Sequence, residues 1–292
     1  MPDSVIELTH LSRAFGTKKA LDDVSLSVPR GSVFGLVGEN GAGKSTLIKH
    51  ILGLWRAQTG SVRVFGADPV AEPAAVLRRI GYLSEQPDLA GWMRVDELMG
   101  YTSAFYPNWD PAYAESLRAR FALDPRARVD TLSKGQRAKL GLIAAQAHRP
   151  DLLLLDEPSS GLDPIVRRDI LEAVIRAVAD EGRTVLFSSH LLDEVERVSD
   201  HLAMLHHGRV ILCSPLDQIK ARHSRFIVRF AAPQAQAPAI AGVVFLKGGD
   251  RQWTAIGDTS RIAAPIAFEA LGASIVEESP ASLDEIFLAH AG

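Results

Sequence analysis

The stretch that decides the fold is Gly38-Glu39-Asn40-Gly41-Ala42-Gly43-Lys44-Ser45, which fits G-x-x-x-x-G-K-[ST] without a mismatch. It follows an apolar run at 32–37 that is typical of a buried strand. It precedes residues 46–54, whose apolar positions have the spacing of a helix buried on one face. A glycine-rich loop between a strand and a helix is the setting in which this pattern binds phosphates. The stretch therefore predicts a nucleotide site within an α/β fold.

The residue types in this loop have separate chemical reasons. Glycines let backbone N–H groups point inward as a nest for anionic oxygens, and the following helix adds the positive end of its dipole. Lys44 supplies a charge for the β- and γ-phosphates, the Ser45 hydroxyl suits Mg²⁺, and the Thr46 hydroxyl suits the α-phosphate. The residues expected to bind ATP here are Gly38, Asn40, Gly41, Gly43, Lys44, Ser45 and Thr46.

Two carboxylates follow the apolar run 152–155, which has the length and continuity of a buried parallel strand. Because ligands of an open α/β sheet bind beyond the carboxyl ends of its strands, we expect both side chains beside the phosphate loop. Asp156 is predicted to hold Mg²⁺ or its water shell. Glu157 is predicted to orient and deprotonate the attacking water, a role that contributes roughly 10²–10⁴-fold in rate.

Strand and helix patterns alternate along much of the chain, which favours a parallel sheet with crossover helices. Residues 5–8 and 24–28 predict strands before the phosphate loop. Residues from about 86 to 147 predict a helical subdomain. Its aromatic side chains form either a small local core or a surface for a partner.

The composition shifts toward the C-terminus, which predicts domains at 1–219 and 220–292. The second is expected to be a small α+β appendage, with a loop at 231–238. The pattern Ser282-Leu283-Asp284-Glu285 is a capping box that opens a final helix. The other expected elements are strands at 226–228, 243–246, 253–256 and 273–276, and a helix at 262–271.

Composition excludes several classes of protein. The 292 residues are 47% hydrophobic and 23% charged, ordinary values for a chain with a core, so a disordered or fibrous protein is excluded. The formal net charge of -3 lacks the basic footprint of nonspecific nucleic-acid binding, and no nucleic-acid partner is expected. The single Cys213 cannot form an internal disulfide. Neither a signal-peptide pattern nor an apolar run of roughly 18 residues is visible. If the chain works at a membrane, other chains are therefore expected to provide the spans.

A further motif, Leu132-Ser133-Lys134-Gly135-Gln136, precedes a long helical run. Ser133 and Gln136 form a capping box. A helix N-terminus with a Ser hydroxyl and a Gly amide is also a phosphate site. Because the chain already has one phosphate site in the loop, the second suits the ATP of a facing subunit.

At this point the sequence resembles the nucleotide-binding subunit of ABC transporters over about residues 3–215. Residues 132–136 are similar to the family signature L-S-G-G-Q, with Lys134 in place of the first Gly. Phe15 stands where the family has an aromatic residue that stacks on adenine, and His190 resembles the histidine that contacts the γ-phosphate. The resemblance implies that the signature touches nucleotide through Ser133, Gly135 and Gln136.

Two loops also resemble the family. Residues 160–163 are similar to the loop that crosses the dimer interface. The family usually has Gln after a strand such as 80–83; in register that position holds Glu85, and Gln86 is next. Both remain candidates for the water shell of the metal. The following segment, with Trp92 and Met93, is where the family docks helices of the membrane subunit, which implies a coupling groove.

The resemblance implies a phosphate-loop ATPase domain with an antiparallel β subdomain and a helical subdomain. It implies ATP and Mg²⁺ as ligands, and catalysis by Glu157, His190 and Lys44. The partners implied are an integral membrane permease and a second ATPase subunit, identical or paralogous, at the cytoplasmic face of the membrane. The segment 282–288 looks like the end of ATPases from ABC-2 type exporters, which implies export of a small molecule, lipid or peptide.

Two alternative functions stay open at the level of sequence. One is a soluble, non-transport ABC ATPase that acts on ribosomes or DNA. The single set of motifs and the short spacing between Lys44 and Ser133 do not favour it. The other is a module that binds ATP without cleaving it, which the presence of Glu157 and His190 disfavours.

Overall fold

The computed structural model describes residues 3–179, 182–234, 236, 238–240, 242–258 and 268–291. The chain divides into two compact units, Met1–Val210 and Ile211–Gly292. The expected domain boundary, after residue 219, lies farther along the chain. Each unit has a β-sheet and a hydrophobic core of its own.

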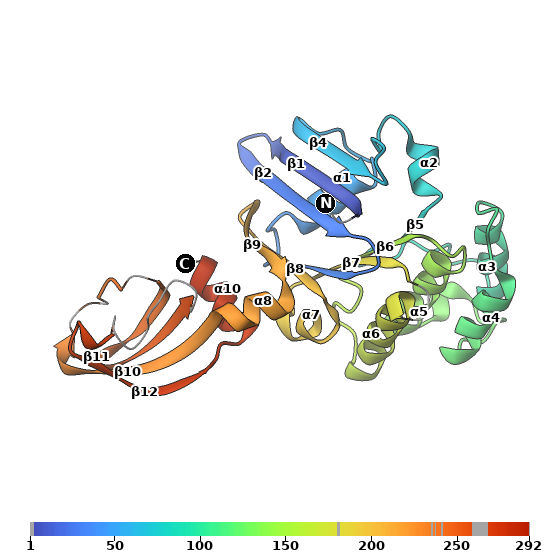
Figure 1. Ribbon diagram of the computed structural model, residues 1–292. Helices are drawn as coiled ribbons and strands as arrows, with labels where there is room; N and C mark the ends of the chain where they lie inside the picture. The colour runs from blue at the N-terminus through green and yellow to red at the C-terminus, as the bar shows by residue number, and fades with distance from the viewer. Residues whose placement is uncertain are drawn as a thin grey trace. The chain divides into compact units, whose positions relative to one another are not determined.

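The first unit is built on a sheet with the strand order β5-β6-β7-β3-β8-β9 (Figure 1). The neighbouring pairs from β5 to β8 are parallel. Every residue of β3, β6 and β7 is buried, because both faces of a parallel sheet are covered. This confirms the predicted α/β fold. The strands are β3 (Val33–Val37), β5 (Ile80–Leu83), β6 (Leu152–Asp156), β7 (Thr184–Ser189), β8 (His201–His206) and β9 (Arg209–Pro215).

A second, antiparallel sheet has the order β2-β1-β4 and is formed by β1 (Ser4–Phe15), β2 (Lys18–Pro29) and β4 (Thr59–Val64). It shares one hydrophobic core with the central sheet and with α1 (Lys44–Ile51). Leu47 and other apolar residues of α1 are fully buried there, and each such side chain contributes about 1.5–3 kcal/mol. This packing fixes the helix that begins at the end of the phosphate loop.

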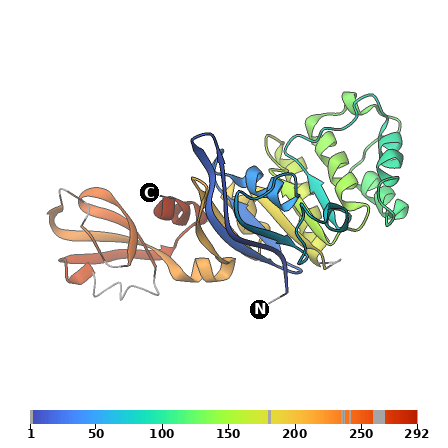
Figure 2. The same ribbon diagram turned by 90° about the horizontal axis from the view of Figure 1, so that it is seen from above.

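Helices gather beyond the β5 edge of the central sheet in Figure 1, and Figure 2 shows the same group from above. There α5 packs against β5, α4 and α3. Helices α6 and α7 contact strands β7 and β3 and cover the sheet there. The helices of this unit are α2 (Pro73–Leu77), α3 (Val95–Ser103), α4 (Pro111–Arg120), the 3₁₀ helix η1 (Val129–Thr131), α5 (Lys134–Gln146), α6 (Pro164–Ala179) and α7 (Leu192–Val198).

The helical subdomain exposes three of the six aromatic residues between 92 and 113 that were candidates for its local core. Trp92 is 70% exposed, Phe105 is 63% exposed and Tyr101 is 54% exposed. The prediction of a local core is therefore wrong for these three, while Met93 is buried. Tyr106 stacks on His148, with ring centroids 3.8 Å apart.

The second unit contains an antiparallel sheet in the order β11-β10-β12. Its core is a cluster that includes Phe226, Trp253 and Phe268. The Ser282 hydroxyl accepts from the backbone N–H of Glu285, and the Glu285 carboxylate accepts from the backbone N–H of Ser282, which confirms the capping box. The elements are α8 (Leu216–Arg222), β10 (His223–Gln234), β11 (Val243–Asp258), β12 (Ala273–Pro280) and α10 (Leu283–Ala291).

Two sequence predictions in this unit need correction. The predicted strands 243–246 and 253–256 are one strand, β11, which continues through the polar residues between them. The predicted loop at 231–238 starts too early, since β10 extends to Gln234. Most of the predicted helix 262–271 lies outside the described residues. Cys213, on β9, is exposed.

Candidate functional site

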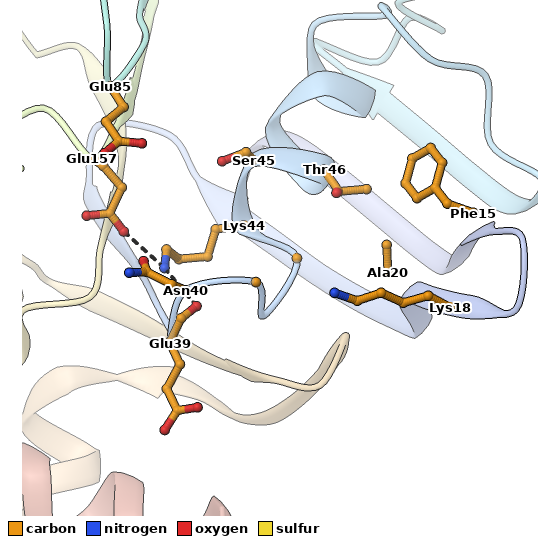
Figure 3. Close-up of a pocket in the computed structure, with 12 residues that line it drawn as sticks. Phe15, Lys18, Ala20, Glu39, Asn40, Lys44, Ser45, Thr46, Glu85 and Glu157 are labelled. Carbon is orange, nitrogen blue, oxygen red and sulfur yellow. Dashed lines mark hydrogen bonds and ion pairs between the residues drawn. The ribbon is translucent and has the colours of Figure 1, made fainter.

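A cavity of about 460 Å³ surrounds the phosphate loop (Figure 3). In Figure 3, Phe15, Lys18 and Ala20 lie on one side of Lys44, Ser45 and Thr46, while Glu85 and Glu157 lie on the other. The cavity is therefore open between an aromatic side and an acidic side. Its lining residues are Phe15, Lys18, Ala20, Glu39, Asn40, Gly41, Gly43, Lys44, Ser45, Thr46, Glu85 and Glu157.

The loop adopts its shape because of its glycines. Gly41 and Gly43 have φ values of 83° and 114°, in the region that favours glycine. A Cβ at Gly43 would also lie 2.4 Å from the Ala20 carbonyl oxygen, and one at Gly38 would lie 2.3 Å from the Leu205 carbonyl oxygen. Residues 40–43 of this loop thus form a tight turn that leads directly into α1.

Lys44 is only 5% exposed, and its ammonium is surrounded by oxygens. The Nζ atom donates to the carbonyl oxygen of Gly38 at 2.5 Å and to that of Glu39 at 3.2 Å. It also forms an ion pair of 3.0 Å with Oε1 of Glu157. This pairing joins the loop after β3 to the residue after β6, as the sequence predicts for a site at the carboxyl edge of the sheet.

Glu157 links Lys44 to His190. Its Oε2 lies 2.7 Å from Nδ1 of His190, in the segment that follows β7. Glu157 itself is buried and has a φ of 50°, an unusual backbone conformation for a non-glycine residue. Such conformations cluster at functional sites, where the surrounding contacts hold them in place.

Ser188 contacts both predicted site carboxylate residues, although the sequence did not single it out. Its Oγ donates to Oδ1 of Asp156 at 2.7 Å and accepts from the backbone N–H of Glu157 at 3.0 Å. Ser188 is opposite Asp156 in the parallel pair β6 and β7, and both residues are buried. The available signal was its place at the carboxyl end of a parallel strand. Asp156 is not among the residues that line the cavity, and its carboxylate is held by this serine.

Glu85 and Gln86 lie in different surroundings. Glu85 lines the phosphate cavity, and its Oε1 accepts from the Ser160 hydroxyl at 3.1 Å. Gln86 lines a neighbouring cavity with Lys134 and Arg137. Of the two candidates for the metal-side loop, Glu85 is the one whose side chain reaches the nucleotide pocket.

Phe15 ends β1 at the rim of the cavity and is 43% exposed. It packs edge-on against Trp55, with ring centroids 5.1 Å apart, and the Arg13 guanidinium lies 4.9 Å from its ring centroid. Its accessible ring edges the same opening as Lys18 and Ala20, two lining residues that the sequence did not indicate.

The signature segment lies outside the phosphate cavity of its own chain. The Ser133 hydroxyl accepts from the backbone N–H of Gln136 at 3.2 Å, and the Gln136 side chain accepts from the backbone N–H of Ser133 at 2.9 Å. Ser133 caps α5, so the predicted capping box is confirmed. Gly135 is buried against Val166 of α6, where an added Cβ would lie 2.9 Å from Cγ2.

The oxygen-bearing side chains of the phosphate cavity suit a magnesium ion that is bound together with a nucleotide. Mg²⁺ in such sites takes one or two carboxylates together with phosphate oxygens and water. The exposed hydroxyl-bearing residue Ser45 and the Glu85 carboxylate line the same cavity. In the described part of the chain, no three His, Cys, Asp or Glu side chains converge as a metal site independent of nucleotide. No helix among the described residues is long and apolar enough to cross a membrane.

Comparisons with known proteins give the following similarities. The family model described as ABC transporter matches residues 21–160. The daunorubicin/doxorubicin resistance ATP-binding protein DrrA of Streptomyces peucetius is 35% identical over 100% of this chain and 93% of that protein. The ABC transporter ATP-binding protein NatA of Bacillus subtilis is 38% identical over 74% of this chain and 91% of its own. A solved ATP-binding subunit of an ABC transporter is 32% identical with a TM-score of 0.68, covering 75% of this chain and 92% of that one.

Proposed function

This chain belongs to the ABC transporter family as an ATP-binding, ATP-hydrolysing subunit, and we propose that it drives export through a separate membrane permease. The observation that carries the proposed chemistry is the contact series Lys44–Glu157–His190 at the edge of the phosphate cavity. It joins a phosphate-binding cation, a carboxylate base and a histidine from three separate segments of the sheet.

The catalytic division of labour follows from these contacts. Lys44 exchanges the Glu157 carboxylate for the β- and γ-phosphates when ATP enters. Glu157 is then free to orient the attacking water and accept its proton. Nδ1 of His190 donates to the second oxygen of Glu157, and the imidazole is proposed to exchange this contact for the γ-phosphate when ATP enters. Preorganised charge of this kind is the main source of catalysis in phosphoryl transfer.

The remaining contacts to ATP divide along the cavity. Phe15 stacks on adenine at the rim, and the amides of Gly41 and Gly43 bind phosphate oxygens. The Thr46 hydroxyl serves the α-phosphate. The proposed Mg²⁺ ligands are Ser45 directly, with Asp156 and Glu85 acting on its water shell. When bound there, the ion would neutralise charge that develops on the phosphates during hydrolysis.

A second ATPase subunit completes the site. The exposed residues Ser133 and Gln136 lie at the N-terminus of α5, away from the cavity of their own chain. We assign them, with Gly135, to the nucleotide of a facing subunit, because a helix N-terminus binds anions. ATP held from both sides stabilises the closed pair, since only that state makes both sets of contacts.

The permease is proposed to dock where the helical subdomain meets the central sheet. A cavity of about 410 Å³ opens there, and the exposed ring of Trp92 belongs to the adjoining loop. Met93 is buried and anchors this loop. An amphipathic helix of the permease suits an apolar groove of this kind. The groove is lined by residues that include Leu52, Leu54, Leu77, Tyr82, Leu89 and Tyr106.

The similarity to DrrA, whose name refers to daunorubicin and doxorubicin resistance, supports export of a small molecule such as a drug, because it extends over the whole chain. The same full-length similarity disfavours a non-transport ATPase. The peripheral location that we propose is the cytoplasmic face of the membrane, bound to the permease.

The decisive experiment is Glu157→Gln. The amide keeps the size of the side chain but cannot act as a base, so we expect ATP hydrolysis to fall by roughly 10²-fold or more. ATP binding should persist, and the ATP-bound variant should accumulate as a dimer. The measurements are steady-state phosphate release, equilibrium ATP binding and molar mass by light scattering with and without ATP.

The matched control is Glu39→Gln, a carboxylate on the rim of the same cavity that has no assigned catalytic contact. A chain with Glu157→Gln that hydrolyses ATP at the wild-type rate contradicts the assignment of the base. Co-purification with a polytopic membrane protein after detergent extraction tests the transport role separately.

A further inference from the structure

The two sequence positions that depart from the family pattern, Lys134 and Glu85, meet at one residue. Nζ of Lys134 donates to the carbonyl oxygen of Ser160 at 2.7 Å, and the Ser160 hydroxyl donates to Oε1 of Glu85 at 3.1 Å. Ser160 thereby joins a cation in the signature segment to a carboxylate of the nucleotide cavity.

Ser160 is also bonded to the proposed base. Its backbone N–H donates to the carbonyl oxygen of Glu157 at 3.1 Å, closing a turn directly after β6. The residue before it is anchored in turn, because the Ser159 hydroxyl donates to Glu194 at 2.5 Å. Ser159 is fixed by Glu194, and the Ser160 N–H is bonded to the Glu157 carbonyl oxygen. A displacement of Ser160 therefore changes the turn that holds Glu157.

The surroundings of Lys134 fit this contact closely. Gly161 has a φ of 63°, and a Cβ added there would lie 2.7 Å from Nζ of Lys134. Gly135 packs tightly on Val166 of α6, so the first turn of α5 is in direct contact with the first turn of α6. The link lies beside a cavity of about 420 Å³ that Glu85, Lys134 and Ser160 line together.

We propose that Lys134 is a positioning residue that connects the signature segment of this chain to its own base through Ser160. The inference rests on the proposed function, in which Ser133, Gly135 and Gln136 contact the ATP of the facing subunit. Binding of that ATP moves the start of α5, and Lys134 transmits the movement to the Glu157 turn and to Glu85. Occupancy of one nucleotide site thus sets the geometry of the base in the other.

The test compares Lys134→Gln, Lys134→Arg and Arg137→Gln in the full-length chain. Gln removes the ammonium, and Arg keeps a cation of similar reach. Arg137 lies about one turn along α5 and lines the same cavity, whereas the bond to the Ser160 carbonyl oxygen is made by Lys134. The readouts are the Hill coefficient and kcat of ATP hydrolysis, equilibrium ATP binding and the thermal unfolding midpoint.

We expect Lys134→Gln to lower the Hill coefficient toward 1 and to reduce kcat about 3- to 10-fold, a range within the usual coupling between contacting residues. ATP binding to the phosphate loop and the unfolding midpoint should not change, because Lys134 is exposed and lies outside the loop. Lys134→Arg should restore most of the cooperativity, and Arg137→Gln should behave as wild type.

A double-mutant cycle adds a second, independent readout. If Ser160 carries the coupling, the loss of kcat in the Lys134→Gln, Glu85→Gln double variant will differ from the product of the two single losses by about twofold or more. Independent multiplication of the two effects overturns the proposal, as does an unchanged Hill coefficient in Lys134→Gln or a wild-type Hill coefficient of 1. A wild-type chain that neither binds nor hydrolyses ATP contradicts the proposed function instead.

Discussion

At the scale of the residue, the site depends on side chains that hold other side chains in place. The carboxylates of Asp156 and Glu157 were predictable because they end an apolar strand beside a phosphate loop. Ser188, which positions both, was not, since a serine in an apolar run is equally compatible with a satisfied core hydroxyl. The choice between Glu85 and Gln86 was also open, because the side-chain direction in a loop depends on tertiary contacts.

Ser188→Ala should reduce kcat about tenfold while changing the Kd for ATP little. Removing the hydroxyl frees one oxygen of buried Asp156 and the backbone N–H of Glu157, and a lost buried partner costs about 1–3 kcal/mol. Ser189→Ala is the control, because that neighbouring buried serine contacts Glu194 and not the two carboxylates. Steady-state kinetics of both variants decide the matter; equal losses in the two would contradict a specific role for Ser188.

Phe15→Ala should weaken ATP binding by about 1–3 kcal/mol, the usual loss when an aromatic platform for a base is removed. Calorimetric titration measures the change. Phe15→Trp should keep most of the affinity, since it preserves a ring at the rim. A Kd for the alanine variant within twofold of wild type would place adenine elsewhere.

At the scale of the element, the parallel strands were the most predictable part of the fold. Strands buried on both faces appear in sequence as short uninterrupted apolar runs, as in β3 and β6. β11 was less predictable because the polar residues 247–252 have the composition of a turn, although the strand continues through them. The exposed aromatic residues of the helical subdomain could not be separated from core residues, because composition does not reveal which face of a helix is covered.

Gly81→Ala should destabilise the first unit by about 1–3 kcal/mol, the usual cost of overpacking. A Cβ at Gly81 on β5 would lie 1.9 Å from the carbonyl oxygen of Ala145 on α5. Gly100→Ala in α3 is the matched control: an added Cβ there meets no atom within 4 Å, so it should stabilise by roughly 0.5–1 kcal/mol. Urea unfolding of both variants measures the difference, and effects of the same sign would contradict the packing.

His148 should lower the free energy of unfolding as the pH falls below 6.5. Burial lowers the pKa of His148 from 6.5 to about 4, and its Nε2 lies 3.1 Å from the Ile80 carbonyl oxygen. The unfolded chain therefore binds this proton more readily than the folded chain. The contribution is present above pH 6.5 and is lost as the pH falls toward 4. Urea titrations across this range should show a shallower pH dependence in His148→Gln, and an unchanged slope would contradict the assignment.

At the scale of the whole molecule, the chain joins two units with separate cores. The shift in composition toward the C-terminus was enough to predict a second domain. The motifs that carry the chemistry all lie in the first unit, which is why the function was far more predictable than the role of the second.

Phe226→Ala should disturb the second unit alone. Phe226 is fully buried in that core, and such truncations cost about 3–5 kcal/mol. Amide hydrogen exchange should become faster in β10 and β12, while ATP binding by the first unit is kept. Loss of exchange protection in β3 and β6 to the same extent would show that the two cores unfold together.

The exposed position of Cys213 on β9 has a practical consequence. Because the chain has one cysteine, a maleimide dye attaches with a stoichiometry of one, and no native thiol has to be replaced first. β9 is the strand in which the first unit ends and the second begins. The emission of a fluorophore placed there can report in real time whether nucleotide turnover changes the surroundings of β9.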